Sequence, residues 1–313
     1  MQECILCYIV NLNLHIKNIP STLTNGVCFG LPIFFSMAFI SVVQAQEPTP
    51  LDKSDYHLFN PTPREQMREM STDRPDKTES PYTVDAGHFQ IESDILTYSH
   101  DHDKSRGGDV ITERWSAAPV NLKVGLLNHM DFQMVIESFN HVRTKDQVEQ
   151  TAERQSGFGD MTFRLKNNFW GNDGGKTSFG IMPFVKVPTS QDRLGNNDVE
   201  GGVIFPLAVE LPMGWSMGLM TEMDFLRNEN NNHYHNSYVN SITFSHDIIG
   251  KLGGYTEFFS ELSSQSDARW IGTVDLGLTY ALTQDIQLDA GVNIGVTESA
   301  DDLNPFVGFS CRF

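Results

Sequence analysis

The chain of 313 residues is 39% apolar and carries a net charge of −18, so it is long enough for a large core or a large barrel. That acidity argues against nucleic acid as a partner, because phosphate binding needs clustered lysine and arginine. No run reaches the roughly 18 continuous apolar residues of a membrane-spanning helix.

The longest apolar run, residues 30–43, ends beside the small-residue pattern Val43-Gln44-Ala45, and polar sequence follows. This arrangement is typical of a signal peptide and its cleavage site, although its long leading region carries only Lys17 as a basic residue. We therefore expect residues 1–45 to be removed, which leaves 313 − 45 = 268 residues. Cys311 is then the only cysteine, which excludes a disulfide framework.

Residues 46–87 are polar, contain six prolines and show no lasting period. We interpret them as an N-terminal periplasmic extension or as a plug inside the structure that follows.

From residue 88 onward, polar and apolar side chains alternate in runs of about 9–14 residues, the pattern of strands with one oily and one polar face. Twelve such runs are expected, an even number, as in single-chain outer-membrane barrels. The runs are 88–98, 113–126, 130–138, 158–170, 176–187, 202–211, 215–226, 237–246, 252–262, 270–282, 285–296 and 305–313.

Short and long connections alternate between these runs. The short ones carry Gly or Asn, or are only two residues long, and the long ones are polar: 99–112, 139–157, 188–201, 227–236, 263–269 and 297–304. Short periplasmic turns and long external loops are typical of a transmembrane barrel, and tryptophans at both strand ends fit two interfacial girdles. The predicted fold is an all-β, antiparallel transmembrane barrel of about 12 strands over 88–313, which closes on Phe313. A soluble lipocalin-type barrel, with its apolar face inward, is the structural alternative.

Several segments resemble the bacterial outer-membrane "transporter" family named for the meta-pathway of phenol degradation. They are STDRPDKTESPYTVDAGHFQIE (71–92), APVNLKVG (118–125), GFGDMTFRLK (157–166), GNDGG (171–175), MPFVKVPT (182–189), VEGGVIFPLAVELP (199–212) and the closing DDLNPFVGFSCRF. The resemblance implies a β-barrel in the outer membrane that admits aromatic or other small hydrophobic compounds. It brings no catalytic residues.

Charged residues on the polar faces are the candidate pore-lining set: Arg164, Lys166, Lys186, Glu222, Asp224, Asp275 and Asp289. They could form a transverse field across an open pore, or a salt-bridged plug that closes the barrel. In the open-pore interpretation, neutralising the three basic residues shifts ion selectivity toward cations.

We interpret the other polar clusters as residues of solvated loops. The pairs His100/His102 and His233/His235 could bind a transition metal, but they offer too few ligands. Asp301 and Asp302 with Glu298 could hold a divalent cation that bridges lipopolysaccharide phosphates, but a solvated loop is favoured. His246 with Ser245 or Ser241 is the only suggestion of a hydrolase, and no motif supports it.

The sequence thus predicts an outer-membrane channel for passive uptake of small aromatic or hydrophobic compounds, with no enzyme activity, cofactor or metal. Its expected partners are outer-membrane lipid, lipopolysaccharide and a small permeant. The alternative is a closed structural or adhesive barrel that acts through external loops 139–157 or 188–201.

Overall fold

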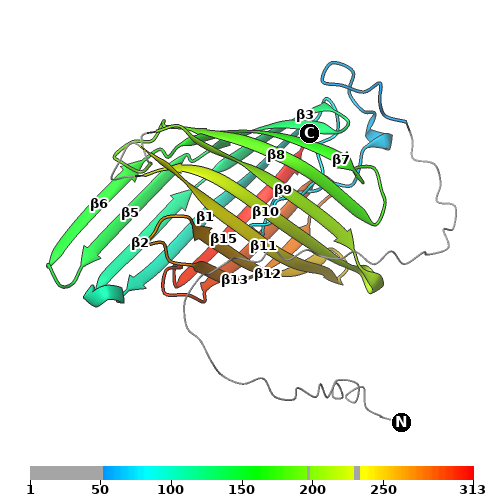
Figure 1. Cartoon of the computed structure of the whole chain (residues 1–313). Coiled ribbons are helices and arrows are strands. Elements are labelled where there is room, and N and C mark those ends of the chain that lie inside the picture. The colour runs from blue at the N-terminus through cyan, green and yellow to red at the C-terminus, as the bar shows by residue number, and fades with distance from the viewer. Residues whose placement is uncertain (1–51, 196–197, 229–232) are drawn as a thin grey trace, which may run out of the picture. The chain divides into compact units, whose positions relative to one another are not determined.

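The computed structural model describes residues 52–195, 198–228 and 233–313, and most of them lie in strands (Figure 1). Within these ranges no helix is both long and apolar enough to cross a membrane. The predicted signal peptide, residues 1–45, lies outside the described residues.

All paired strands are antiparallel, and β15 pairs with β1 to close the sheet into a barrel. The strands are β1 (Phe89–Asp103), β2 (Val110–Ala117), β3 (Val120–Leu127), β4 (Met130–Ile136), β5 (Phe139–Asp146), β6 (Thr151–Gly157), β7 (Met161–Trp170), β8 (Thr177–Val187), β9 (Glu200–Glu210), β10 (Trp215–Arg227), β11 (Tyr234–Ile249), β12 (Leu252–Ser263), β13 (Ile271–Ala281), β14 (Ile286–Gly295) and β15 (Leu303–Arg312). Three short 3-10 helices are η1 (Arg64–Gln66), η2 (Ser105–Gly107) and η3 (Pro212–Gly214).

Three wall strands are broken into two halves each: β2 with β3, β4 with β5, and β6 with β7. β1 spans the first break, because its residues 89–93 pair with β3 and its residues 96–103 pair with β2. Ala118 marks that break with a φ of 51°, a left-handed conformation that interrupts a strand. Fifteen strands less these three divisions give 15 − 3 = 12 wall strands, which confirms the predicted barrel.

The predicted loops 99–112 and 139–157 are wrong in extent. β1 continues to Asp103, β2 begins at Val110, and β5 and β6 form a hairpin across most of 139–157. The β5–β6 hairpin projects at one end of the barrel (Figure 1). Its residues are mostly polar or exposed on both faces, so the apolar alternation that marks the other strands is absent.

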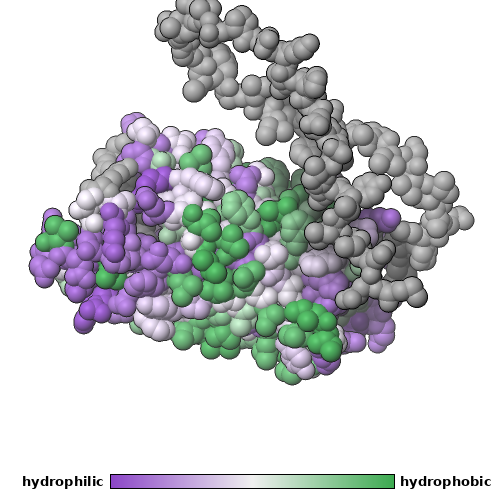
Figure 2. All heavy atoms as spheres, turned by 90° about the horizontal axis from the view of Figure 1, so that it is seen from below, coloured by the Kyte–Doolittle hydropathy of each residue, from purple (hydrophilic) through white to green (hydrophobic). Residues whose placement is uncertain are grey.

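Apolar side chains face outward from the wall and are exposed, among them Phe205, Leu276, Leu278, Leu288 and Val307. In Figure 2 they gather across the middle of the visible face, with hydrophilic side chains toward its left end. Trp115, Trp170, Trp215 and Trp270 are also exposed, as interfacial tryptophans would be. The apolar face of the wall is therefore outside, which rules out the lipocalin-type alternative and places the barrel in the bacterial outer membrane.

The inner face is mostly polar and buried. Lys123, Lys166, Gln133, Asp131 and Asp275 are each at most 4% exposed. Side chains of the wall alone would leave polar groups of this kind facing water in a barrel of this size. Another part of the chain covers them.

Candidate permeation pathway and the loop inside it

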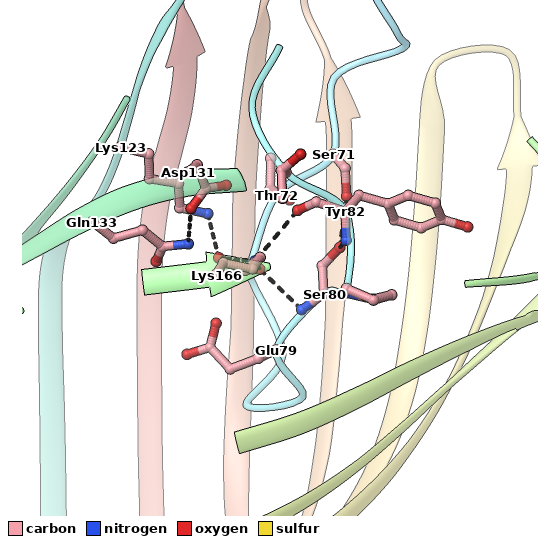
Figure 3. Close-up of polar contacts among 12 residues, drawn as sticks. Ser71, Thr72, Glu79, Ser80, Tyr82, Lys123, Asp131, Gln133 and Lys166 are labelled. Carbon is pink, nitrogen blue, oxygen red and sulfur yellow. Dashed lines mark hydrogen bonds and ion pairs between the residues drawn. The ribbon is translucent and has the colours of Figure 1, made fainter. Parts of the chain in front are cut away.

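Residues 71–83, called here the lumen loop, fill part of the barrel interior. The two legs of the loop run close together, and the hydroxyl oxygens of Ser71 and Ser80 lie 2.9 Å apart. The loop contacts inward-facing side chains of β1, β3, β7 and β10 to β14, which surround it on most sides. Figure 3 shows this loop between the strands, with Lys123 and Lys166 reaching toward it from the wall.

Asp73 joins the loop to two lysines of the wall. Its carboxylate pairs with Lys166 at 2.6 Å and also with Lys123, which binds Glu92 at 2.5 Å. All four side chains are at most 4% exposed. A buried charge persists only where it is paired, so Asp73 neutralises lysines that would otherwise face an empty lumen.

The cations of the loop meet carboxylates on the opposite part of the wall. Arg74 lies 2.7 Å from both Asp94 and Asp289, and Lys77 lies 3.2 Å from Asp275. The amide of Lys77 donates to the carboxylate of Glu257 at 2.9 Å. Both cations of the loop therefore face carboxylates of the wall.

The far end of the loop follows the same rule. Glu79 pairs with Arg164 at 2.6 Å, and the Thr78 hydroxyl lies 2.6 Å from that of Ser241. The amide of Glu79 contacts the sulfur of Met220 at 3.4 Å.

A second ion-pair cluster fixes the base of the loop. Lys53, Arg68 and Arg312 lie 3.5–3.6 Å from the carboxylate of Asp85, which is 1% exposed. Gly125 lets this segment pass, because a Cβ there would lie 2.0 Å from the carbonyl oxygen of Asp85. The base is thus anchored independently of the tip.

The structure divides the predicted pore-lining residues into two groups. Arg164, Lys166, Asp275 and Asp289 bind the lumen loop, as the plugged interpretation of these charges expects. Lys186 pairs with Glu200 at 2.5 Å, and Glu222 and Asp224 lie two positions apart on the inner face of β10. That these seven residues line a pore remains a prediction.

Sequence reasoning missed the residues of the loop itself and several of their partners: Asp73, Arg74, Lys77, Glu79, Glu92, Asp94, Lys123 and Glu257. The available signal was the alternation of sign along Asp-Arg-Pro-Asp-Lys-Thr-Glu (73–79), inside a segment with no strand period. Lys123 also stood on the polar face of its strand.

The remaining candidates for chemistry have structural partners. Ser245 and His246 are consecutive in β11 and point to opposite faces, and the ring of His246 packs against that of Trp215 with centres 4.8 Å apart. His102 binds Asp109 at 2.7 Å, and Asp301 binds Arg114 at 3.1 Å. Over the described ranges, no group of three or more His, Cys, Asp or Glu side chains is arranged to hold a metal ion.

Asp76 lies in the tip of the lumen loop and has a raised carboxyl pKa. Burial raises this pKa against a hydrogen bond from Thr243, the carboxylates of Asp73 and Glu79 add to the rise, and together they bring it from 3.8 to about 7. Burial also raises the pKa of Glu79, against the charge of Arg164. A raised carboxyl pKa favours the docked loop fully below pH 3.8, and this contribution is lost as pH rises through about 7.

We therefore expect the conductance of the protein in planar bilayers to rise as the pH increases from about 4 to about 7 and to level off above that, because a charged Asp76 loosens the tip. Asp76→Asn should flatten this rise, whereas Asp52→Asn, outside the lumen loop, should leave it unchanged. A wild-type conductance that stays constant from about pH 4 to 8 would contradict the role given to Asp76.

Comparison with known proteins agrees with the outer-membrane barrel fold described above. Residues 72–313 match the family described as "Putative MetA-pathway of phenol degradation". The chain belongs to this family. No curated protein matches the chain.

Among solved structures, the chain is similar to an outer membrane channel from Pseudomonas putida F1, with a TM-score of 0.58 and 12% identity. That match covers 78% of this chain and 100% of the channel. The translocator domain of the autotransporter NalP from Neisseria meningitidis matches with a TM-score of 0.48 and 9% identity, over 72% of this chain and 88% of that domain. The first likeness shows that this family member shares a barrel fold with outer-membrane proteins.

Proposed function

We propose that the protein is a passive, non-enzymatic outer-membrane channel for small, largely apolar molecules, and that the lumen loop is its gate. The observation that carries this proposal is the match of charge between loop and wall. Five charged residues in seven positions (Asp73, Arg74, Asp76, Lys77 and Glu79) project into the barrel, and four of them pair with wall charges of opposite sign. Ion pairs of this kind hold one conformation and can be exchanged for water when the loop withdraws.

A cavity of about 350 Å³ remains beside the docked loop. It is lined by Arg74 and Asp76 of the loop and by Ser216, Ser245 and Thr279 of the wall, among others. Space on one side of the loop lets it shift without unfolding the barrel. The separate anchoring of the base supports a hinged tip rather than a plug that leaves the barrel.

The expected permeant is neutral or cationic. Around Lys186 the lumen carries the carboxylates Glu200, Glu222, Asp224 and Glu261, so an anion entering from that side meets net negative charge. A closed structural barrel, the alternative from the sequence, would use the same ion pairs with no gating.

To test the channel, residues 72–79 should be replaced by two glycines, which the 2.9 Å contact between the Ser71 and Ser80 hydroxyls makes sterically feasible. We expect steady single-channel conductance in planar bilayers at least about tenfold above that of the full mature chain, because the ion-paired tip is gone while the base cluster remains. Uptake of toluene and phenol into proteoliposomes should rise in parallel.

The matched control replaces 188–195, an external segment of the same length, with two glycines; it should not raise conductance. If the loop-replaced barrel keeps its strand content but shows neither conductance nor uptake, the channel function is refuted and the closed barrel is favoured.

A further inference from the structure

Three cations gather on one face of the β5–β6 hairpin. Arg143 and Lys145 of β5 lie two positions apart, so their side chains share a face of the strand, and Arg154 of β6 lies directly opposite Arg143 in the register. The facing residue of β2 is Glu113, which pairs with Arg143 at 3.2 Å. These three cations, called here the hairpin patch, thus meet one carboxylate, in a chain with a net charge of −18.

The hairpin patch continues the lipid-facing surface of the wall. Phe139 and Trp115 are 47% and 44% exposed on the outside of the barrel, and Trp115 lies opposite His141 in the register. Residues 139, 141, 143 and 145 alternate onto this same outward face. The row of Arg143 therefore begins about 7 Å beyond an interfacial tryptophan. It lies at the end of the barrel opposite the C-terminus (Figure 1).

The charges of the hairpin patch are incompletely satisfied by the protein. Among the described residues, Lys145 and Arg154 form no ion pair, and the Nε of Arg143 is buried without a hydrogen-bond acceptor. Like charges directly opposite each other on antiparallel strands repel, and Arg143 and Arg154 are such a pair. An anion bound between the two guanidinium groups would offset this repulsion and supply acceptors.

The position of the patch indicates which anion this is. Tryptophans of an outer-membrane barrel lie at the level of the lipid headgroups, so the cations just beyond Trp115 lie among the headgroups of the external leaflet. Lipid A, the membrane anchor of lipopolysaccharide, carries phosphate groups directly above its acyl chains. Arginine side chains match phosphate oxygens with two parallel hydrogen bonds, and lysine adds a point charge.

We propose that the hairpin patch binds a phosphate group of lipopolysaccharide, with Arg143 and Arg154 on either side of the phosphate and Lys145 next to them. Trp115 and Phe139 contact the acyl chains below. The site assigns residues to a partner that the sequence suggested only in general terms. It differs from the cation bridge considered at Asp301, since Asp301 binds Arg114, whose side chain points to the opposite face from that of Trp115.

The test measures lipid binding to the mature chain in neutral detergent by native mass spectrometry. The probes are diphosphoryl lipid A, dephosphorylated lipid A and phosphatidylglycerol. Diphosphoryl lipid A should bind saturably and more tightly than the other two. The double variant Lys145→Gln/Arg154→Gln should weaken this binding by about twentyfold, because each cation near an anionic lipid surface contributes roughly fivefold in affinity.

Two further double variants control for charge and for folding. Lys176→Gln/Lys251→Gln removes two exposed lysines beside the short turns and changes the net charge equally, yet it should bind like the wild type. Lys145→Arg/Arg154→Lys keeps both cations and should also retain binding. Heat-modifiable mobility in electrophoresis checks that each variant is folded.

Equal weakening by the two glutamine variants, or unchanged binding by Lys145→Gln/Arg154→Gln, would overturn the site. Phosphatidylglycerol that binds as tightly as diphosphoryl lipid A would also overturn it, since the patch would then attract any anionic lipid. The inference is independent of the proposed function, because the patch lies outside the lumen. A protein that binds lipid A at the patch but never conducts would refute the channel and support this site.

Discussion

Asp73→Asn should open the barrel. In the wild-type protein one carboxylate neutralises Lys123 and Lys166, and all three side chains are at most 4% exposed. Asparagine would remove the ion pair of Lys166 and leave Lys123 paired with Glu92. Removing one partner of a buried ion pair costs about 3–5 kcal/mol, which shifts the ratio of docked to undocked loop by a factor of about 10² to 10³ or more.

Single-channel recording in planar bilayers measures this shift as the fraction of time spent open. Asp109→Asn is the matched control, since Asp109 pairs with His102 at an exposed site and is 41% exposed. That variant should record like the wild type. An Asp73→Asn protein that folds, as judged by heat-modifiable mobility in electrophoresis, yet stays as closed as the wild type would contradict the role of this ion pair.

Charge reversal of Glu79 and Arg164 gives the second large effect. Glu79→Arg alone places two guanidinium groups against each other, and Arg164→Glu alone places two carboxylates against each other. Each single variant should be open for most of the recording. The double variant should close again, because like-charge contact is replaced by an ion pair in the same mostly buried position.

The recovery distinguishes a specific contact from a general loss of stability. The comparison pair is Arg143 with Glu113, 3.2 Å apart, 43% and 33% exposed and distant from the loop. Exposed pairs contribute roughly 0–1 kcal/mol, so its reversal should change conductance little in any combination. If the Glu79/Arg164 double variant is as open as either single variant, the two residues do not hold the tip together.

The barrel was predictable because each wall strand has lipid on one face and a polar interior on the other. Apolar and polar residues therefore alternate along the strand. The β5–β6 hairpin was not predicted because it has solvent on both sides, so its residues show no such alternation.

The contacts of the lumen loop have no local signature in the sequence. Thr78 meets Ser241, and Arg74 meets Asp289, across 163 and 215 positions. Charged residues such as Lys166 could be placed on an inner face, but the sequence does not show that their counterions come from the segment before the first strand.

The anchoring of the loop also sets an order of assembly. Its base needs Arg312, at the end of the last strand, and its tip needs partners on strands from β1 to β14. β15 completes the wall by pairing with β1, where the amide of Phe313 donates to the carbonyl of Phe89 at 2.8 Å. The loop has all its counterions in place only when this seam is closed, so complete docking of the loop cannot precede closure of the barrel wall.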